Sequence, residues 1–130
     1  MLYIILALIM FGLLIAVHEF GHFAAAKLFG IQVNEFSIGM GPALLKRQKG
    51  ETLYSLRLFP IGGYCAMEGE DEEASSENPR AFGNAAGWKQ AIVLVAGALM
   101  NFLTGLVIVL ILYAGAVGFY YEVYNGPVER

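Results

Sequence analysis

The chain has 130 residues, of which 58% are hydrophobic and 15% are charged, and its formal net charge at pH 7 is −3. This length allows one domain at most, and an apolar fraction this high is typical of membrane proteins. The mild acidity, with no basic or aromatic stripe, excludes nucleic acid as a partner, and the single cysteine, Cys65, excludes an intrachain disulfide.

The first predicted element is an apolar run over residues 2–17 that keeps its helical character to about residue 29. A helix of roughly 20 apolar residues crosses the hydrocarbon core of a bilayer, which is about 30 Å thick. A secretory signal peptide would look similar, but no basic residue precedes this run and no convincing small-residue cleavage site follows it. We therefore predict a first transmembrane helix within residues 1–30.

Both histidines of the chain lie in this helix, in the pentapeptide His18-Glu19-Phe20-Gly21-His22, which is an H-E-x-x-H pattern. Helical geometry places the two histidines on adjacent turns about 40° apart, and Glu19 about 60° from His22. Two neutral imidazoles can bind one Zn²⁺ and leave a position open for water, whose proton a nearby carboxylate can accept. The pattern predicts His18 and His22 as zinc ligands and Glu19 as the catalytic base.

Two other interpretations of the pentapeptide have less support. Polar residues at a helix end could have this spacing by chance, but each ionisable side chain in a transmembrane helix costs roughly 2.5 to 3.5 kcal/mol on insertion scales. A closed structural zinc site is the second alternative, and there Glu19 would have no purpose. The position of His18 along the helix predicts a metal inside the bilayer, nearer its cytoplasmic face.

Residues 31–67 alternate between apolar and polar side chains, with glycines between the runs. A turn is expected at Lys49-Gly50-Glu51, and a strand pattern resumes over residues 52–59. Because the end of this segment is apolar, we predict a membrane-associated β-hairpin region that touches the bilayer or the first helix. Residues 68–87 are acidic and polar and predict a surface loop.

Residues 88–121 form the second apolar run and predict a second transmembrane helix, with Trp88 and Lys89 at the membrane interface. Asn101 lies within this run, and an asparagine in an apolar helix needs an internal partner. We expect Asn101 near the active site, where it would position the substrate or another group; plain packing between helices is an equally open alternative.

These elements together predict a membrane α-helical fold, in which two transmembrane helices are joined by a membrane-associated β-hairpin region and an acidic loop. Seven of the eight basic residues fall between positions 27 and 89, at or between the facing ends of the two helices, and Arg130 alone follows the second helix. The positive-inside rule then predicts a multi-pass protein of the plasma membrane, with the connecting segment in the cytoplasm and both termini outside.

The H-E-F-G-H helix, followed by Phe36-Ser37-Ile38-Gly39-Met40-Gly41-Pro42 and Gly62-Gly63-Tyr64, resembles the site-2 protease family of intramembrane zinc metalloproteases. The resemblance implies that residues 31–67 handle substrate and that Phe36, Gly62 and Gly63 bind or position it; a plain structural hairpin is the alternative. The segment from Ala96 to Phe102 is similar to the family's A-G-P-x-x-N-F pattern, with Ala98 in place of proline. This similarity implies positioning roles for Gly97 and Asn101.

The resemblance also implies parts that this sequence does not contain. The family takes its third zinc ligand from an aspartate in an L-D-G motif on a later transmembrane helix, and no such motif occurs here. Residues 122–130 are similar to the lead-in to a PDZ-like domain. We therefore expect the N-terminal part of a longer protein, which could be inactive alone, since Glu35, Glu68, Glu70 and Asp71 do not lie on a helix aimed at the pentapeptide.

The predicted function is that of an intramembrane zinc metalloendopeptidase, which hydrolyses peptide bonds within the transmembrane segment of a substrate protein. By family analogy the substrate is an anti-sigma factor, and the lipid bilayer is the second partner. The alternative is a non-catalytic membrane scaffold or docking module, which would have no use for Glu19. An ion transporter is a third possibility, although two helices without pseudo-symmetric partners argue against it.

Overall fold

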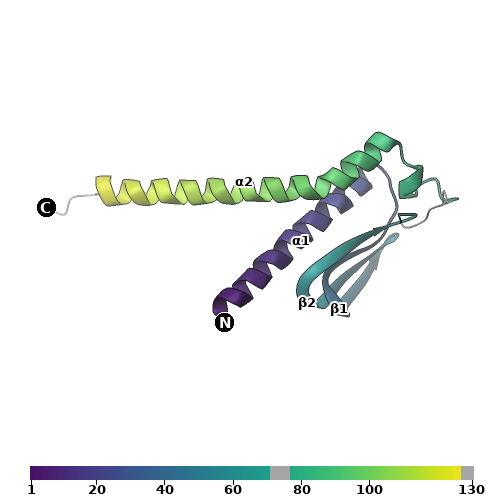
Figure 1. Ribbon diagram of the computed structural model, residues 1–130, viewed down its shortest axis with the longest axis horizontal. Coiled ribbons are helices and arrows are strands. Elements are labelled where there is room, and N and C mark those ends of the chain that lie inside the picture. The colour runs from purple at the N-terminus through teal and green to yellow at the C-terminus, as the bar shows by residue number, and fades with distance from the viewer. Residues whose placement is uncertain (71–76, 127–130) are drawn as a thin grey trace.

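The computed structural model describes residues 1–70 and 77–126. Its elements follow in the order α1 (Leu2–Leu28), β1 (Val33–Lys49), β2 (Thr52–Met67), the short 3-10 helix η1 (Phe82–Asn84) and α2 (Gly87–Asn125). The two helices meet where α1 ends and α2 begins, and then diverge, while the β-hairpin lies beside α1 (Figure 1). Residues 71–76, which include the acidic part of the expected loop, and residues 127–130 of the expected lead-in lie outside the described residues.

The prediction of a membrane α-helical fold class was wrong. The structure combines two helices with a two-stranded antiparallel sheet, and its strands are 17 and 16 residues long. The two apolar runs favour a helical class, and hydropathy does not reveal that the glycine-containing strands between them pair into a sheet of their own. Both helices are long and apolar enough to cross a membrane, but two such helices are weak evidence that they do.

The hairpin is folded over on itself, as the strand register shows. Pairs from Lys49↔Thr52 to Leu45↔Leu56 run antiparallel beside the turn, and pairs from Ile38↔Gly63 to Val33↔Met67 close the other end. In addition, residues 35–38 of β1 each have a second partner in residues 53–56 of β2, and over these pairs the two sets of numbers increase together. The first part of β1 therefore lies between the two halves of β2, at the centre of the sheet.

Glycines make this fold-over possible at the points where the strands bend. Gly39 and Gly63 have φ angles of +85° and +157°, which L side chains rarely adopt. A Cβ atom at either position would lie 2.6 Å from a backbone oxygen of the facing strand, Phe59 O for Gly39 and Ser37 O for Gly63. A residue with a side chain at either bend would therefore have to push the two facing strands apart.

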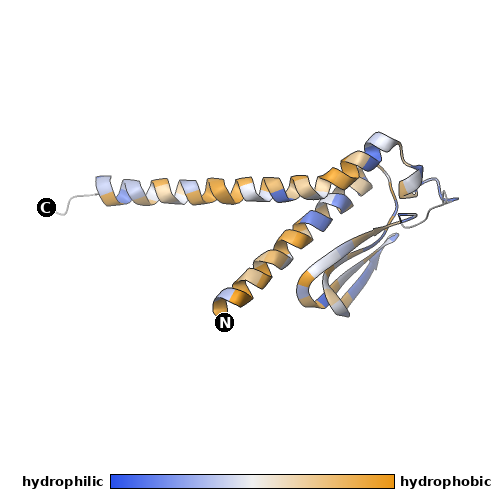
Figure 2. Ribbon diagram, in the orientation of Figure 1, coloured by the Kyte–Doolittle hydropathy of each residue, from blue (hydrophilic) through white to orange (hydrophobic). Residues whose placement is uncertain are grey.

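The main core lies where the sheet packs against the C-terminal half of α1. The Phe36 ring lies 4.9 Å from the Phe23 ring of α1 between centroids, and Tyr54 contacts the same ring from β2 at 5.9 Å. Hydrophobic residues cover most of both helices, whereas hydrophilic residues are more frequent in the sheet (Figure 2). The buried cluster consists of Ala25, Ala26, Ile31, Val33, Phe36, Cys65, Met67 and Val93.

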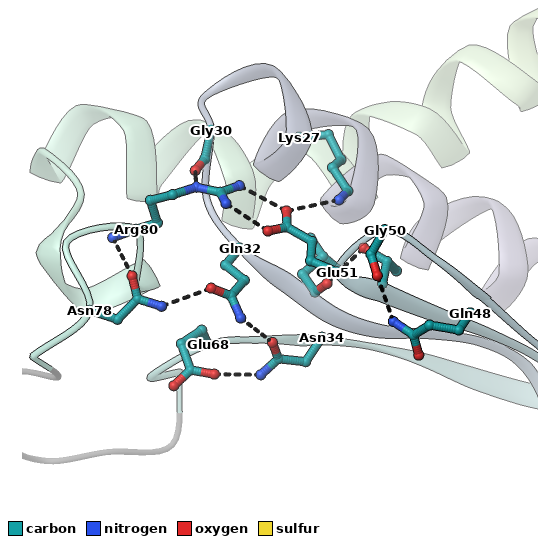
Figure 3. Close-up of polar contacts among 12 residues, drawn as sticks. Lys27, Gly30, Gln32, Asn34, Gln48, Gly50, Glu51, Glu68, Asn78 and Arg80 are labelled. Carbon is teal, nitrogen blue, oxygen red and sulfur yellow. Dashed lines mark hydrogen bonds and ion pairs between the residues drawn. The ribbon is translucent and has the colours of Figure 1, made fainter.

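A cluster of polar contacts ties the turn of the hairpin to the end of α1 (Figure 3). Glu51, in the turn, accepts hydrogen bonds from both terminal nitrogens of Arg80 at 2.6 and 2.8 Å and from Lys27 Nζ at 3.2 Å. Arg80 also donates from Nε to the carbonyl of Gly30 at 2.8 Å. One carboxylate thus joins three segments that are far apart in the sequence: helix α1, the β1–β2 turn and the approach to α2.

Candidate metal centre

The H-E-x-x-H residues lie together on one side of α1, next to α2. His18, Glu19 and His22 each offer one ligand atom, and these atoms all lie within 4.8 Å of one another. The two imidazoles stand almost perpendicular, with ring centroids 4.7 Å apart and an angle of 81° between their planes. The four-residue spacing produces this arrangement, because side chains at i and i+4 of a helix lie on the same face.

Helix α2 fixes the orientation of His22. The Nδ1 atom of His22 lies 2.7 Å from the backbone carbonyl oxygen of Val93. A carbonyl can only accept, so Nδ1 carries the proton and donates it. In the neutral imidazole the second ring nitrogen, Nε2, then carries the free lone pair that can bind a metal ion.

Gly97 of α2 lies directly over the two histidines. A Cβ atom at this position would lie 2.6 Å from Nε2 of His18 and 2.7 Å from Nε2 of His22. A side chain at this position would collide with both ring nitrogens, so the glycine lets the backbone of α2 approach the histidine pair without pushing the imidazoles apart. The two imidazoles, with the carboxylate of Glu19 beside them, fit zinc chemistry.

A cavity of about 360 Å³ opens beside the histidine pair. Its apolar wall comes from the preceding turns of α1, and Glu19 and Asn101 supply polar groups. In such a cavity the Glu19 carboxylate can contact water while the apolar wall contacts a hydrophobic polypeptide chain. The cavity is lined by Phe11, Leu14, Ile15, His18, Glu19 and Asn101.

The structure places the other predicted site residues at different distances from this centre. Asn101 lies next to it, with Nδ2 3.5 Å from Nδ1 of His18. Phe36 is a core residue whose ring packs 6.4 Å from that of Phe20 in the pentapeptide. Gly62 and Gly63 lie at the bend of the hairpin, where a Cβ on Gly62 would meet Met40 and one on Gly63 would meet Ser37.

Two carboxylates that the sequence analysis weighed as further ligands are engaged elsewhere. Glu35 accepts hydrogen bonds from Ser55 and Arg57, and although desolvation acts in the opposite direction, hydrogen bonds from Tyr64, Ser55 and Arg57 lower its pKa. Glu68 accepts a hydrogen bond from Asn34. Asp71 lies outside the described residues.

Sequence reasoning missed the contribution of Val93, since the group that acts is a backbone carbonyl and any residue could supply it. A signal was nevertheless present. Val93, Gly97 and Asn101 recur every fourth residue, so they share one face of α2. The same spacing runs from Phe11 through Ile15 to Glu19 and from Leu14 to His18, and these residues line the cavity.

Comparison with known proteins identifies the family. Residues 6–125 match the sequence model of Peptidase family M50. The chain belongs to this family.

The relatives of the chain carry names that agree with this family. A candidate zinc metalloprotease of Clostridium acetobutylicum is 46% identical over 105 residues, which cover 81% of this chain and 30% of the relative. Candidate zinc metalloproteases of Clostridium perfringens and Fusobacterium nucleatum are 48% and 45% identical over 107 residues, covering 82% of this chain and 31% of each relative. The chain thus spans about a third of the length of these M50 relatives.

The comparisons confirm the family that the sequence motifs predict. They also confirm zinc as the cofactor at the level of the family, because the relatives are named for zinc.

Proposed function

We propose that this chain carries the zinc-binding and acid–base residues of an M50 zinc metalloendopeptidase. His18 and His22 would hold the metal through Nε2, and Glu19 would be the catalytic base. The observation that carries the proposal is the gathering of these three side chains within 4.8 Å under the bare backbone of Gly97. Side chains that served only to pack α1 against α2 would have no reason to converge in this way.

The chemistry of this site would be hydrolysis of an amide bond. Bound zinc would lower the pKa of water to about 7 and polarise the substrate carbonyl. The carboxylate of Glu19 would accept a proton from the attacking water as its oxygen bonds to the carbonyl carbon. Glu19 would then return that proton to the leaving nitrogen as the carbon–nitrogen bond breaks. His22, held by the Val93 carbonyl, would keep its unprotonated nitrogen on the metal side throughout.

A further zinc ligand would come from outside residues 1–130. In the part of the chain that the structure describes, the candidate ligand group consists of two histidines and one glutamate. The glutamate is needed as the base, and catalytic zinc sites use three protein ligands. The aspartate of the L-D-G motif, which the family resemblance implies, would supply the third.

The substrate of the full-length protein is proposed to be the transmembrane segment of another membrane protein, such as an anti-sigma factor. Large apolar side chains of both helices are exposed, as a bilayer would require; Ile9 is 51% exposed, Val95 62% and Leu112 67%. The apolar cavity beside Glu19 suits an apolar chain of this kind. The charge distribution supports a plasma-membrane location with the connecting segment in the cytoplasm and both termini outside.

Glu19→Gln in the full-length protein tests this function. The purified wild-type and variant proteins are reconstituted in lipid vesicles with a reporter that contains one transmembrane segment, and cleavage is followed by gel and mass spectrometry. We expect a loss of about 10² to 10⁴-fold in the cleavage rate, the range for removal of a general base. Zinc content should stay at the wild-type level, because Glu19 is not proposed as a ligand. Equal cleavage by the two proteins would refute the assignment.

A further inference from the structure

One face of α2 lines up with the histidine face of α1. Val93 accepts the Nδ1 proton of His22, Gly97 covers both Nε2 atoms, and Asn101 lies beside Nδ1 of His18. The helices cross so that Val93, the earliest of these α2 residues, meets His22, the later histidine, and Asn101 meets His18. The four-residue step from His22 to His18 is thus spanned by the eight-residue step from Val93 to Asn101, with Gly97 midway and facing both rings.

The side chain of Asn101 is incompletely paired in this position. Its Oδ1 atom is buried and has no hydrogen-bond partner among residues 1–70 and 77–126. Its Nδ2 atom points towards Nδ1 of His18 at 3.5 Å, too long for a good hydrogen bond. A buried amide oxygen without a partner is rare in folded proteins and calls for an explanation.

A half-turn of the amide group places its oxygen, instead of its nitrogen, opposite Nδ1 of His18. The oxygen and nitrogen of an asparagine side chain have nearly the same shape, so their placement is assigned from the surrounding hydrogen bonds. A histidine that binds a metal through Nε2 carries its proton on Nδ1 and needs an acceptor there. With the amide turned, Oδ1 of Asn101 faces Nδ1 of His18 across about the same 3.5 Å, and a small movement of either side chain would make an N–H···O hydrogen bond. Nδ2 then takes the buried place that Oδ1 leaves.

We propose that Asn101 is the positioning residue of His18, accepting its Nδ1–H as the Val93 carbonyl accepts that of His22. This inference rests on the proposed function, because it takes the two histidines as zinc ligands. Helix α2 then supplies one acceptor for each ligand. A backbone carbonyl serves His22, but the position of Asn101, eight residues further along α2, requires a side chain to reach His18.

The competing interpretation is that Asn101 contacts the substrate. Asn101 also lines the cavity that holds Glu19, so a substrate group could reach its amide. The two roles differ in what they do to the metal. A residue that orients His18 changes zinc affinity with no substrate present, whereas a substrate contact changes the KM and leaves zinc affinity unchanged.

The test measures zinc affinity of the full-length protein in detergent by competition with a colorimetric chelator. Asn101→Leu keeps the approximate size and removes the acceptor, and we expect zinc to dissociate at about 10 to 100-fold higher concentration, the usual effect of losing such a partner. Asn101→Asp restores an acceptor and should bind zinc within a few-fold of wild type. Thr104→Val is the matched control, because the Thr104 hydroxyl donates only to the Met100 carbonyl of its own helix, and it should bind zinc normally.

The outcomes separate this inference from the proposed function. Wild-type zinc affinity in Asn101→Leu would overturn the positioning role, and a raised KM in the same variant would assign Asn101 to the substrate. If Asn101→Leu fails to fold, Asn101→Asp decides: near-normal affinity supports the role, and a large loss contradicts it. His22→Ala should abolish tight zinc binding; if it does not, the histidine assignment itself fails, whatever the Asn101 variants do.

Discussion

At the scale of single residues, the metal centre depends on a side chain that is missing. Gly97→Ala would place a methyl group 2.6 to 2.7 Å from the two Nε2 atoms. We expect zinc binding to weaken by at least about tenfold, the lower end of what is lost when the surroundings of a ligand are changed. Zinc titration of the purified full-length protein measures this.

The control for Gly97→Ala is a second glycine of the same helix. Gly105 has open space where its Cβ would be. Gly105→Ala should leave zinc binding unchanged and could stabilise α2 slightly, since alanine is favoured over glycine in a helix by about 0.5 to 1 kcal/mol. If both variants bind zinc like wild type, the space under Gly97 is not needed for the ion.

The histidine pair and Glu19 can be predicted from spacing alone, because a helix fixes which side chains share a face. Asn101 could be singled out by its polarity in an apolar run, although its partner could not, since that depends on how α2 crosses α1. The role of Gly97 likewise could not be predicted without knowing how the helices cross. Its presence is visible in the sequence, but the reason for it is the close approach of two imidazoles from the other helix.

At the scale of elements, the turn of the hairpin is held by charge. Hydrogen bonds from Arg80, with a further one from Lys27, hold the pKa of Glu51 at about 2 instead of the usual 4.5. A carboxyl group with a lowered pKa stabilises the folded state above its unfolded pKa, and that stabilisation is lost as the pH falls towards 2. The loss should therefore occur between about pH 4.5 and pH 2.

Glu51→Gln tests this expectation. The variant should be less stable than wild type at neutral pH, and the difference should shrink as the pH is lowered through that window. Thermal unfolding in detergent at a series of pH values measures it, and Glu77→Gln serves as a carboxylate control from the same connecting segment. A constant difference between Glu51→Gln and wild type down to pH 2 would show that the Glu51 charge does not stabilise the turn.

The fold-over of the hairpin predicts a graded response to glycine substitution. Gly39→Ala combines a φ of +85° with a Cβ at 2.6 Å from the Phe59 carbonyl oxygen. We expect it to destabilise the protein by about 1 to 3 kcal/mol, more than Gly50→Ala, where φ is +63° and the space is open. Chemical denaturation compares the two, and equal effects would mean that the tight contact at Gly39 relaxes freely.

Alternation of polar and apolar residues predicts that residues 31–67 form strands, and the glycine at position 50 predicts the turn. The double pairing of residues 35–38 is not visible in the sequence. Alternation fixes which side chains face the same way but says nothing about which strand lies on each edge. The bends at Gly39 and Gly63 decide that, because they allow one half of the hairpin to lie against the other.

At the scale of the whole molecule, hydropathy alone leads to the wrong fold class. Two apolar runs dominate the composition and favour a membrane α-helical class, yet long strands occupy much of the region between the helices. Hydropathy indicates whether a segment prefers an apolar environment, but it does not predict how the more polar region between the helices folds. The family resemblance, by contrast, rests on short motifs at fixed places and is confirmed by the match over residues 6–125.

The position of the metal between two helices predicts that zinc contributes to overall stability. A ligand that binds only the folded state adds about 2.7 kcal/mol when its concentration is 100 times its Kd. Removing zinc from the full-length protein with a chelator should therefore lower its Tm in detergent. The His22→Ala variant should show no such drop, and an equal drop in both proteins would place the stabilising metal elsewhere.

The meeting of α1 and α2 at one end only (Figure 1) makes the metal centre the pivot of a lever. When a rod tilts about a point, displacement grows with distance from that point. From Gly97 to Asn125 the helix extends roughly 40 Å, so a tilt of about 5° moves its far end by roughly 3 to 4 Å. At the pivot the same tilt shifts the ligands by only a fraction of an ångström. A tilt of α2 would thus move its far end while the histidines keep their geometry.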